Sequence, residues 1–193
     1  MMEQKIVYFE KPGGEENTVQ TLGLAKARAE ELGIRTVVVA STAGGTAVKA
    51  VDVFKGYKVI IVTHVAGMRE PNTQEFTEEN RKIVEQKGGI IVTAAHVFGA
   101  LHRSLGATGS PPIPTSAMGD IMANTLRTFG QGMKVVCECA AMAADAGAVR
   151  VDEEIISIGG TGRGADTAVV LQPSYSHRYF NLRVKEIICK PRL

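Results

Sequence analysis

The segment at 41–46 (STAGGT) combines one serine and two threonines with two adjacent glycines. It follows an apolar stretch at 36–40 and precedes a stretch at 47–51 whose pattern suits a helix. Such a strand–turn–helix passage aims backbone N–H groups and hydroxyls at one point, which favours a phosphate site. The same residues would also cap a helix without any anion. No Gly-Lys-Ser/Thr sequence follows, so this 41–46 turn is not a Walker A loop.

A second glycine-rich segment occupies 159–167 (GGTGRGADT). It contains a match to the Gly-x-Gly-x-x-Ala dinucleotide fingerprint, which requires a helix directly afterwards. Residues 167–171 instead read as a strand and Pro173 closes it, so the fingerprint is rejected. Arg163 suits bidentate phosphate contact, and Asp166 suits acceptance of hydrogen bonds from ligand hydroxyls. We therefore predict a ligand-binding loop, the alternative being a plain connection between strands.

Two histidines end similar apolar segments, His64 after IIVT and His96 after IIVTAA. No carboxylate or cysteine stands at a matching short spacing, so no metal site is predicted. The histidines are expected to hydrogen-bond to backbone or ligand. Cys137 and Cys139 lie in a predicted helix, where positions two apart face different sides, and are expected to be buried thiols. No Gly-x-Ser-x-Gly motif occurs, and spacing alone identifies no nucleophile.

The elements that must position these residues alternate along the chain. Strands are predicted at 5–9, 36–40, 58–63, 90–93, 154–158, 167–171 and 184–189, with helices at 17–32, 47–54, 77–87, 121–129 and 132–146. The first helix is expected to take Asn17 or Thr18 as its N-cap and to bury Val19, and 109–114 (GSPPIP) is predicted to be loop. This order predicts an α/β fold of three layers, α/β/α, with a mostly parallel sheet and antiparallel edge strands at the C-terminus.

Ligands of open α/β sheets bind beyond the carboxyl ends of the strands. Polar segments are expected there at 13–18, 41–46, 63–67, 93–96 and 159–167. We therefore expect these segments to converge at one edge of the sheet.

The bulk composition restricts the class of protein. The chain has 193 residues, of which 45% are hydrophobic and 22% charged, and we expect a single domain over 1–193. A net charge of +2 without a basic cluster argues against nucleic acid as partner. No apolar run would cross a membrane, no signal peptide is visible, and the three cysteines cannot all pair, which favours the cytoplasm. The apolar segment at 184–189 is expected to be an exposed edge suited to a homo-oligomer.

Motifs spread over nearly the whole chain resemble a stand-alone family of small proteins that share the fold of the pyruvate kinase C-terminal domain (pyruvate kinase alpha/beta domain proteins). The resemblance rests on Gly14, Asn17 and Thr18, on the 41–46 turn, on 62–64 (VTH), and on 160–168. The 41–46 turn also looks like the loop that holds a sugar-phosphate effector in pyruvate kinase itself.

The resemblance implies FMN as cofactor, with its phosphate at the 41–46 turn and its ribityl chain and ring toward 63–67 and 160–167. The cofactor-binding residues it implies are Asn17, Ser41, Thr42, Gly44, Gly45, Thr46, Thr63, His64, Gly67, Thr161, Gly162, Arg163, Gly164, Asp166 and Thr167. Trp is absent and aromatic residues make up 5%, so Tyr175, Tyr179 and Phe180 are candidates for stacking only if the C-terminal segment folds over the site.

The resemblance does not imply kinase activity, because that chemistry belongs to a separate (β/α)8 barrel in the full-length enzyme. The leading hypothesis is a protein that binds FMN or a related phosphorylated ligand, with no catalytic residue identified. The alternatives are a flavin-dependent oxidoreductase and a non-catalytic regulatory or assembly module.

Overall fold

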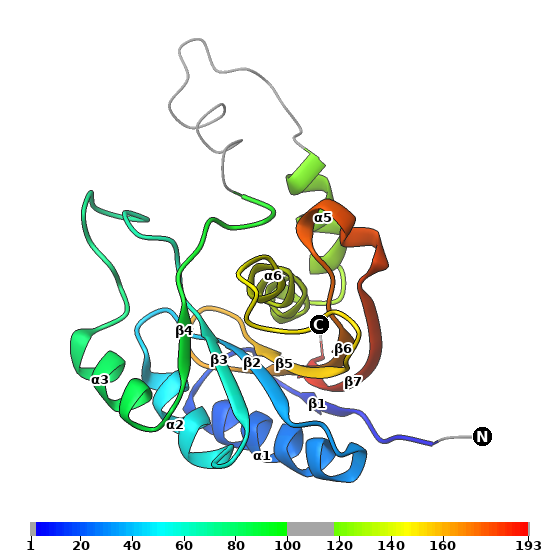
Figure 1. Cartoon of the computed structure of the whole chain (residues 1–193). Helices are drawn as coiled ribbons and strands as arrows, with labels where there is room; N and C mark the ends of the chain where they lie inside the picture. Colours follow the sequence, from blue (N-terminus) through cyan, green and yellow to red (C-terminus); the bar gives the residue numbers. More distant parts are fainter. Residues whose placement is uncertain (1–2, 100–117, 193) are drawn as a thin grey trace.

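The computed structural model describes residues 3–99 and 118–192, and Figure 1 shows the arrangement of their elements. The predicted loop at 109–114 lies outside the described residues. The strands are β1 (Val7–Phe9), β2 (Thr36–Ala40), β3 (Lys58–Val62), β4 (Ile90–Val92), β5 (Ile155–Gly159), β6 (Thr167–Gln172) and β7 (Arg183–Pro191). The helices are α1 (Glu15–Leu32), α2 (Gly45–Val53), α3 (Glu78–Gln86), α5 (Met118–Arg127), α6 (Gln131–Asp145) and the 3-10 helix η1 (Ser176–Asn181).

All seven strands join one sheet in the order β1-β7-β6-β5-β2-β3-β4. The pairs β1–β7, β2–β5, β2–β3 and β3–β4 are parallel, whereas β6 runs antiparallel to both β5 and β7. The predicted α/β class, with a mostly parallel sheet and antiparallel strands from the C-terminal part, is therefore confirmed.

Helices cover both faces of this sheet (Figure 1), with α1, α2 and α3 on one side and α6, flanked by α5, on the other. Each face carries its own apolar core. Leu22, Phe54 and Val84 belong to the first core, and Val136 and Met142 of α6 to the second. Strands β2 and β3 are buried on both faces, which explains their unbroken apolar sequences.

The predicted exposed edge at 184–189 is wrong for the end of this segment. Strand β1 pairs in parallel with Cys189, Lys190 and Pro191, so that β1 is the outermost strand beside this end of β7. Among the described residues, no strand pairs with 184–188 on that side. Ile188 and Cys189 are buried, and the exposed part of β7 consists of Arg183, Val184 and Lys185. The uncovered part of β7 carries Arg183 and Lys185 beside Val184, and such charges disfavour pairing with a second copy.

The start of α1 differs from the prediction. The helix begins at Glu15 with Gly14 as its N-cap, and Asn17 and Thr18 lie in its first turn. Val19, expected in the buried face, is 58% exposed, because Thr18 and Thr21 occupy that face instead. The connection between β6 and β7, where no helix was among those predicted, contains η1.

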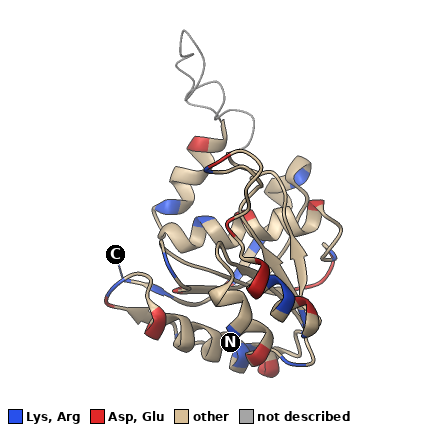
Figure 2. Cartoon of the chain, turned by 90° about the vertical axis from the view of Figure 1, so that its left-hand side faces the viewer, with Lys and Arg blue, Asp and Glu red and all other residues tan. Residues whose placement is uncertain are grey.

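Acidic and basic residues are interspersed over the elements that Figure 2 presents. In the described part of the chain, no helix is both long enough and apolar enough to span a bilayer.

The three cysteines are free and buried, as predicted for Cys137 and Cys139. Burial raises the pKa of the Cys137 thiol to about 12 and that of Cys189 to about 11, from 9.0 for an exposed thiol. Since only the thiolate is nucleophilic, we expect all three to resist alkylation by iodoacetamide at about pH 8 in the native protein and to react in denaturant. Mass spectrometry of the alkylated chain measures this, and rapid native labelling of any of the three contradicts it.

The same pKa shifts predict that stability falls in alkaline solution. The folded-state pKa values lie above those of the exposed thiols, so ionisation favours the unfolded chain. The stabilising contribution is complete below about pH 9 and is lost as the pH rises through the folded-state values.

Candidate functional site

Polar loops from five strands meet at one edge of the sheet. Strands β1, β2, β3, β4 and β5 run in the same direction, so the segments that follow them leave the sheet at a common carboxyl edge. Strand β6 runs the opposite way and begins at this edge with Thr167. The expected convergence of the segments at 13–18, 41–46, 63–67, 93–96 and 159–167 is therefore found.

The 41–46 turn leads directly into α2, with Gly44 as N-cap at φ 105°. The buried Ser41 accepts a hydrogen bond at its Oγ from Ala47 N (3.2 Å), so part of the helix-capping function is met by this serine. Within the described residues, no hydrogen bond engages the N–H groups of Gly45 and Thr46 or the Thr46 hydroxyl. The turn therefore leaves these three donors available at the start of the helix.

Helix α3 holds the turn in place. The Ala43 carbonyl accepts hydrogen bonds from Asn80 Nδ2 (2.9 Å) and from Thr77 N (3.3 Å). A Cβ at Gly44 would lie 2.4 Å from Asn80 Cβ and would also require an unfavourable positive φ. Only glycine therefore fits at position 44, whereas a Cβ at Gly45 meets no atom within 4 Å.

Asp166, at the end of the 159–167 loop, is completely buried. Its Oδ2 accepts hydrogen bonds from Gly13 N (2.8 Å) and Thr161 N (3.1 Å), and its Oδ1 accepts one from Thr167 Oγ1 (2.7 Å). Both carboxylate oxygens are thus engaged by the protein itself. In this structure Asp166 ties the loop after β1 to the loop after β5.

Further contacts interlock these two loops. Gly14 N donates to Arg163 O (2.9 Å), and Thr18 Oγ1 donates to Gly14 O (2.6 Å) while accepting from Ala165 N (2.9 Å). The Asn17 amide donates to Gly13 O and to Lys11 O, both at 2.7 Å. The 159–167 loop is therefore a rigid part of the fold, and its Arg163 side chain is exposed.

Three helices begin at this edge after a glycine N-cap, which has no side chain to accept a hydrogen bond from the first N–H groups: α1 after Gly14, α2 after Gly44 and α6 after Gly130. A Cβ at Gly132 in α6 would lie 2.1 Å from Thr167 Oγ1, which places that helix start beside the 159–167 loop. The positive ends of three helix dipoles are thus directed toward the carboxyl edge, which favours a negatively charged ligand.

A chain of hydrogen bonds connects Thr42, His64 and Glu75. Thr42 Oγ1 lies 3.3 Å from His64 Nε2, and His64 Nδ1 lies 2.6 Å from Glu75 Oε2. Arg69 Nε contacts the other oxygen of Glu75 at 2.9 Å. Sequence reasoning missed Glu75, because it reaches His64 only through the fold of the long connection between β3 and α3.

Thr63 and His96 complete the surroundings of His64. Thr63 Oγ1 lies 2.7 Å from Thr93 Oγ1, and the rings of His64 and His96 are 5.4 Å apart between centroids. Across residues 3–99 and 118–192, no group of three or more His, Cys, Asp or Glu side chains is arranged to hold a metal. Gly67 donates its N–H to Thr73 O and so closes a turn within its own loop.

The predicted site residues therefore form two groups. Thr42, Thr63 and His64 lie together beside the start of α2, whereas Asn17 and the residues of the 159–167 loop gather around Asp166 and the start of α1. Because β5 and β2 are neighbouring strands, the two groups are adjacent along the edge. An ion pair from Lys49 Nζ to Glu15 Oε1 (2.8 Å) links α2 with α1.

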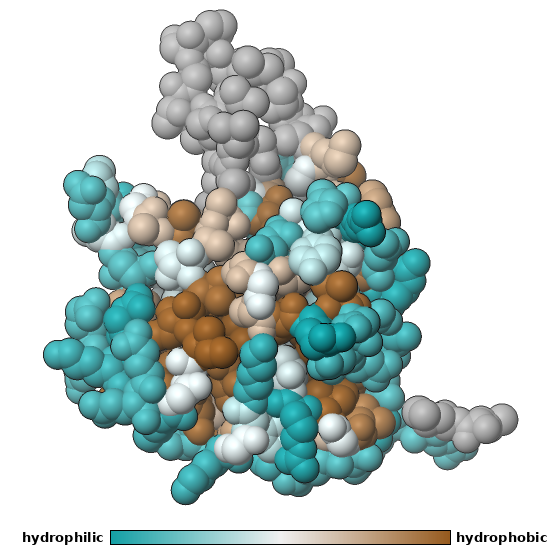
Figure 3. All heavy atoms as spheres, in the orientation of Figure 1, coloured by the Kyte–Doolittle hydropathy of each residue, from teal (hydrophilic) through white to brown (hydrophobic). Residues whose placement is uncertain are grey.

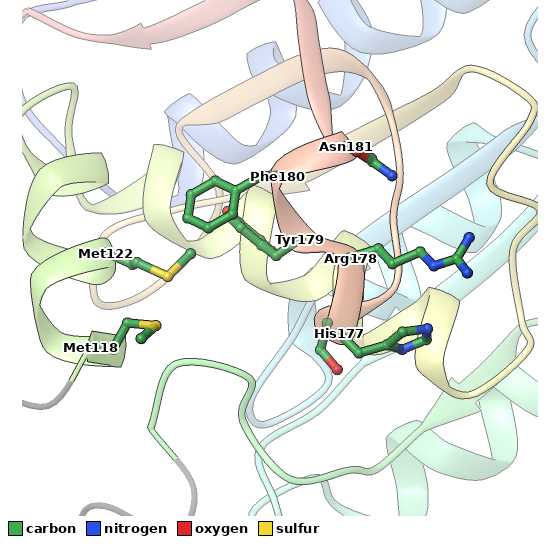
Figure 4. A pocket seen from close by; sticks show the side chains of 8 residues that line it. Met118, Met122, His177, Arg178, Tyr179, Phe180 and Asn181 are labelled. Carbon is green, nitrogen blue, oxygen red and sulfur yellow. The ribbon is translucent and has the colours of Figure 1, made fainter.

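Two surface pockets lie away from these loops. One is lined by Met118 and Met122 of α5 and by residues 176–181 of η1 (Figure 4). The other lies between β4 and the end of α6, where Figure 3 shows an apolar area. Neither is lined by the 41–46 turn or the 159–167 loop.

The aromatic residues considered for stacking lie on or next to η1, which packs against α6. Tyr179 contacts Phe98 edge-on, and Tyr175 stacks on His177. These side chains belong to the α6 side of the molecule.

The fold and site define an α/β protein with a polar, donor-rich carboxyl edge. No protein-family model matches the chain.

Proposed function

We propose that the carboxyl edge of the sheet binds FMN or a related phosphorylated ligand, with the phosphate in the 41–46 turn. The observation that carries this proposal is the set of available donors at the start of α2, namely the N–H groups of Gly45 and Thr46 and the Thr46 hydroxyl. They lie in a turn that Ser41 and Asn80 hold rigid, so little ordering is needed when an anion binds.

The electrostatic surroundings support an anionic ligand. Three helix N-termini lie at this edge, and each is equivalent to roughly half a positive elementary charge. Glu15 and Glu16 in the first turn of α1 oppose its share, whereas the first turns of α2 and α6 contain no acidic residue. Arg163 on the neighbouring loop adds a cationic side chain, whereas the charge of Lys49 on α2 is balanced by its ion pair with Glu15. A phosphate would complete the hydrogen bonding at the start of α2 and neutralise part of this charge.

The proposed position of the rest of the ligand follows from the order of the strands. A ribityl chain leaving the 41–46 turn passes toward 63–67 on one side or toward 160–164 on the other, since β3 and β5 both neighbour β2. Backbone faces of the 159–167 loop would then contact the flavin ring. The motif resemblance to the pyruvate kinase alpha/beta domain family supports FMN as the ligand. It also supports the fold of the pyruvate kinase C-terminal domain for this chain.

Comparison of FMN with riboflavin tests the proposal directly, because the two ligands differ only by the phosphate. We expect FMN to bind at least tenfold more tightly, equivalent to about 1.4 kcal/mol, and to raise the melting temperature at saturating concentration. Fluorescence titration and thermal unfolding measure the two effects. Equal affinity for both flavins, or no binding of either, rejects the phosphate site.

Flavin chemistry is tested separately. Under anaerobic conditions, bleaching of the FMN-loaded protein by NADH or NADPH would favour the flavin-dependent oxidoreductase. An unchanged absorption spectrum would favour a protein that does not use these electron donors.

A further inference from the structure

The hydrogen-bonded chain from Thr42 through His64 to Glu75 lies at the proposed phosphate position. We infer that it activates the Thr42 hydroxyl as a nucleophile, and that the protein transfers or hydrolyses the phosphoryl group of phosphomonoesters. This inference rests on the proposed function, because the 41–46 turn must first hold the phosphoryl group.

The direction of the hydrogen bonds supports this role. Arg69 Nε contacts Glu75 Oε1, and the Oε2 of a carboxylate only accepts hydrogen bonds, which places a proton on His64 Nδ1. In the neutral imidazole, Nε2 then carries the lone pair, and it faces Thr42 Oγ1 at 3.3 Å. The hydroxyl thus donates to a base that a carboxylate orients, which is the arrangement that activates hydroxyl nucleophiles.

The backbone around His64 is fixed as well. The His64 carbonyl accepts hydrogen bonds from Gln74 Nε2 (3.0 Å) and from Thr63 Oγ1 (2.9 Å). Among the described residues, Thr42, Glu75 and His96 face the His64 ring, and Arg69 contacts the other oxygen of Glu75. The imidazole is therefore held from the loops after β2, β3 and β4 together.

Burial does not explain why both nitrogens of His64 have protein partners. The His64 side chain is 37% exposed, so water could satisfy its nitrogens without a protein partner. The carboxylate of Glu75 is more enclosed at 17%, which keeps the orienting group shielded while the base remains open to a ligand. The Gly45 and Thr46 donors in the same turn are placed to stabilise the charge on the transferring phosphoryl oxygens.

The proposed reaction needs only the phosphomonoester and water as reactants. Thr42 Oγ forms a bond to phosphorus as the bond from phosphorus to the ester oxygen breaks, and His64 Nε2 takes the hydroxyl proton and passes it to the departing alcohol. Water then attacks the phosphothreonine, His64 takes one of its protons and returns it to Thr42 Oγ, and inorganic phosphate leaves. Glu75 is a positioning residue that stabilises the transient imidazolium.

The experiment incubates the full chain with FMN or p-nitrophenyl phosphate and measures riboflavin, p-nitrophenol and inorganic phosphate. We expect the rate of phosphate release to fall at least 100-fold in Thr42→Ala and in His64→Asn. The rate of Thr42→Ser should stay within tenfold of the wild type, because serine keeps the hydroxyl. Rapid acid quenching followed by peptide mass spectrometry should find a phosphoryl group on Thr42 in the wild type. Thr125→Ala, at an exposed threonine of α5, is the matched control with unchanged rate.

Glu75→Gln keeps the size of the side chain and removes its charge, so it tests orientation. We expect a tenfold or greater loss in kcat with little change in KM, and an altered pH–rate profile, which a structural role alone would not cause.

The outcomes separate this inference from the proposed function. If the wild type binds FMN more tightly than riboflavin yet releases no phosphate, the inference is overturned and the binding function stands. If Thr42→Ala hydrolyses as fast as the wild type, the nucleophile is also misassigned. If FMN is neither bound nor hydrolysed, the proposed function itself fails. If p-nitrophenyl acetate acylates Thr42 while neither FMN nor p-nitrophenyl phosphate releases phosphate, the proposed phosphoryl chemistry is overturned as well.

Discussion

Replacing Asp166 with alanine is expected to lower the free energy of unfolding by about 4 kcal/mol, because it removes a buried carboxylate that accepts hydrogen bonds from three protein donors. The N–H groups of Gly13 and Thr161 and the hydroxyl of Thr167 would lose their acceptor inside the protein. Asp166→Asn should cost less, about 2 kcal/mol, since the amide keeps one accepting oxygen but presents a donor to other donors. Urea or thermal unfolding measures both effects.

Arg163→Ala is the matched control, because Arg163 lies in the same loop with an exposed side chain, and its carbonyl bond to Gly14 N is kept. Its unfolding free energy should stay within about 0.5 kcal/mol of the wild type. A value for Asp166→Ala within about 1 kcal/mol of the wild type would show that the carboxylate does not hold the two loops together.

Gly45→Asp is expected to weaken FMN binding by at least tenfold without unfolding the protein, equivalent to about 1.4 kcal/mol. A Cβ at this position meets no atom within 4 Å, so the side chain fits, and an acidic residue is favoured in the first turn of a helix. The new carboxylate occupies the positive end of α2 and repels a phosphate there. At about 4 Å, two like charges near a protein surface repel by roughly 4 kcal/mol.

Gly45→Ala separates charge from bulk. It adds the same Cβ without charge, and we expect FMN affinity within about threefold of the wild type, while helix propensity raises the melting temperature slightly. Fluorescence titration of both variants alongside thermal unfolding gives the comparison. Unchanged affinity in a folded Gly45→Asp protein would remove the 41–46 turn from the ligand site.

The sequence allowed the local elements of the site to be predicted well. The run from Thr36 to Ala47 encodes strand, turn and helix start in adjacent residues, so its conformation depends mainly on near neighbours. Thr77 was likewise predicted at the start of its helix, and its side chain accepts a hydrogen bond from Asn80 N. The start of α1 was misplaced, because Asn17 uses its amide to bind the preceding loop instead of capping the helix.

The topology was predictable only in part. Alternating strands and helices indicate a parallel sheet, but not which strand covers which edge. Strand β1 pairs with Cys189–Pro191 of β7, from the opposite end of the chain, and this contact covers the end of the edge that the apolar pattern at 184–189 suggested was open. Such pairing depends on long-range contacts that a pattern of neighbouring residues does not contain.

The sequence by itself determined the chemistry available at the carboxyl edge: a hydroxyl- and glycine-rich turn before a helix, a second glycine-rich loop, and histidines at the ends of apolar strands. Local rules of backbone conformation and the two-faced burial of parallel strands are enough to read these features. Only the tertiary structure decided the roles. It turned Asp166 inward to bind backbone donors across the two loops, and it brought Glu75 onto His64 and His64 onto Thr42. Hydrogen bonds between residues distant in sequence exist only once the sheet sets its loops side by side, and the geometry of those bonds distinguishes a structural carboxylate from one that orients a base.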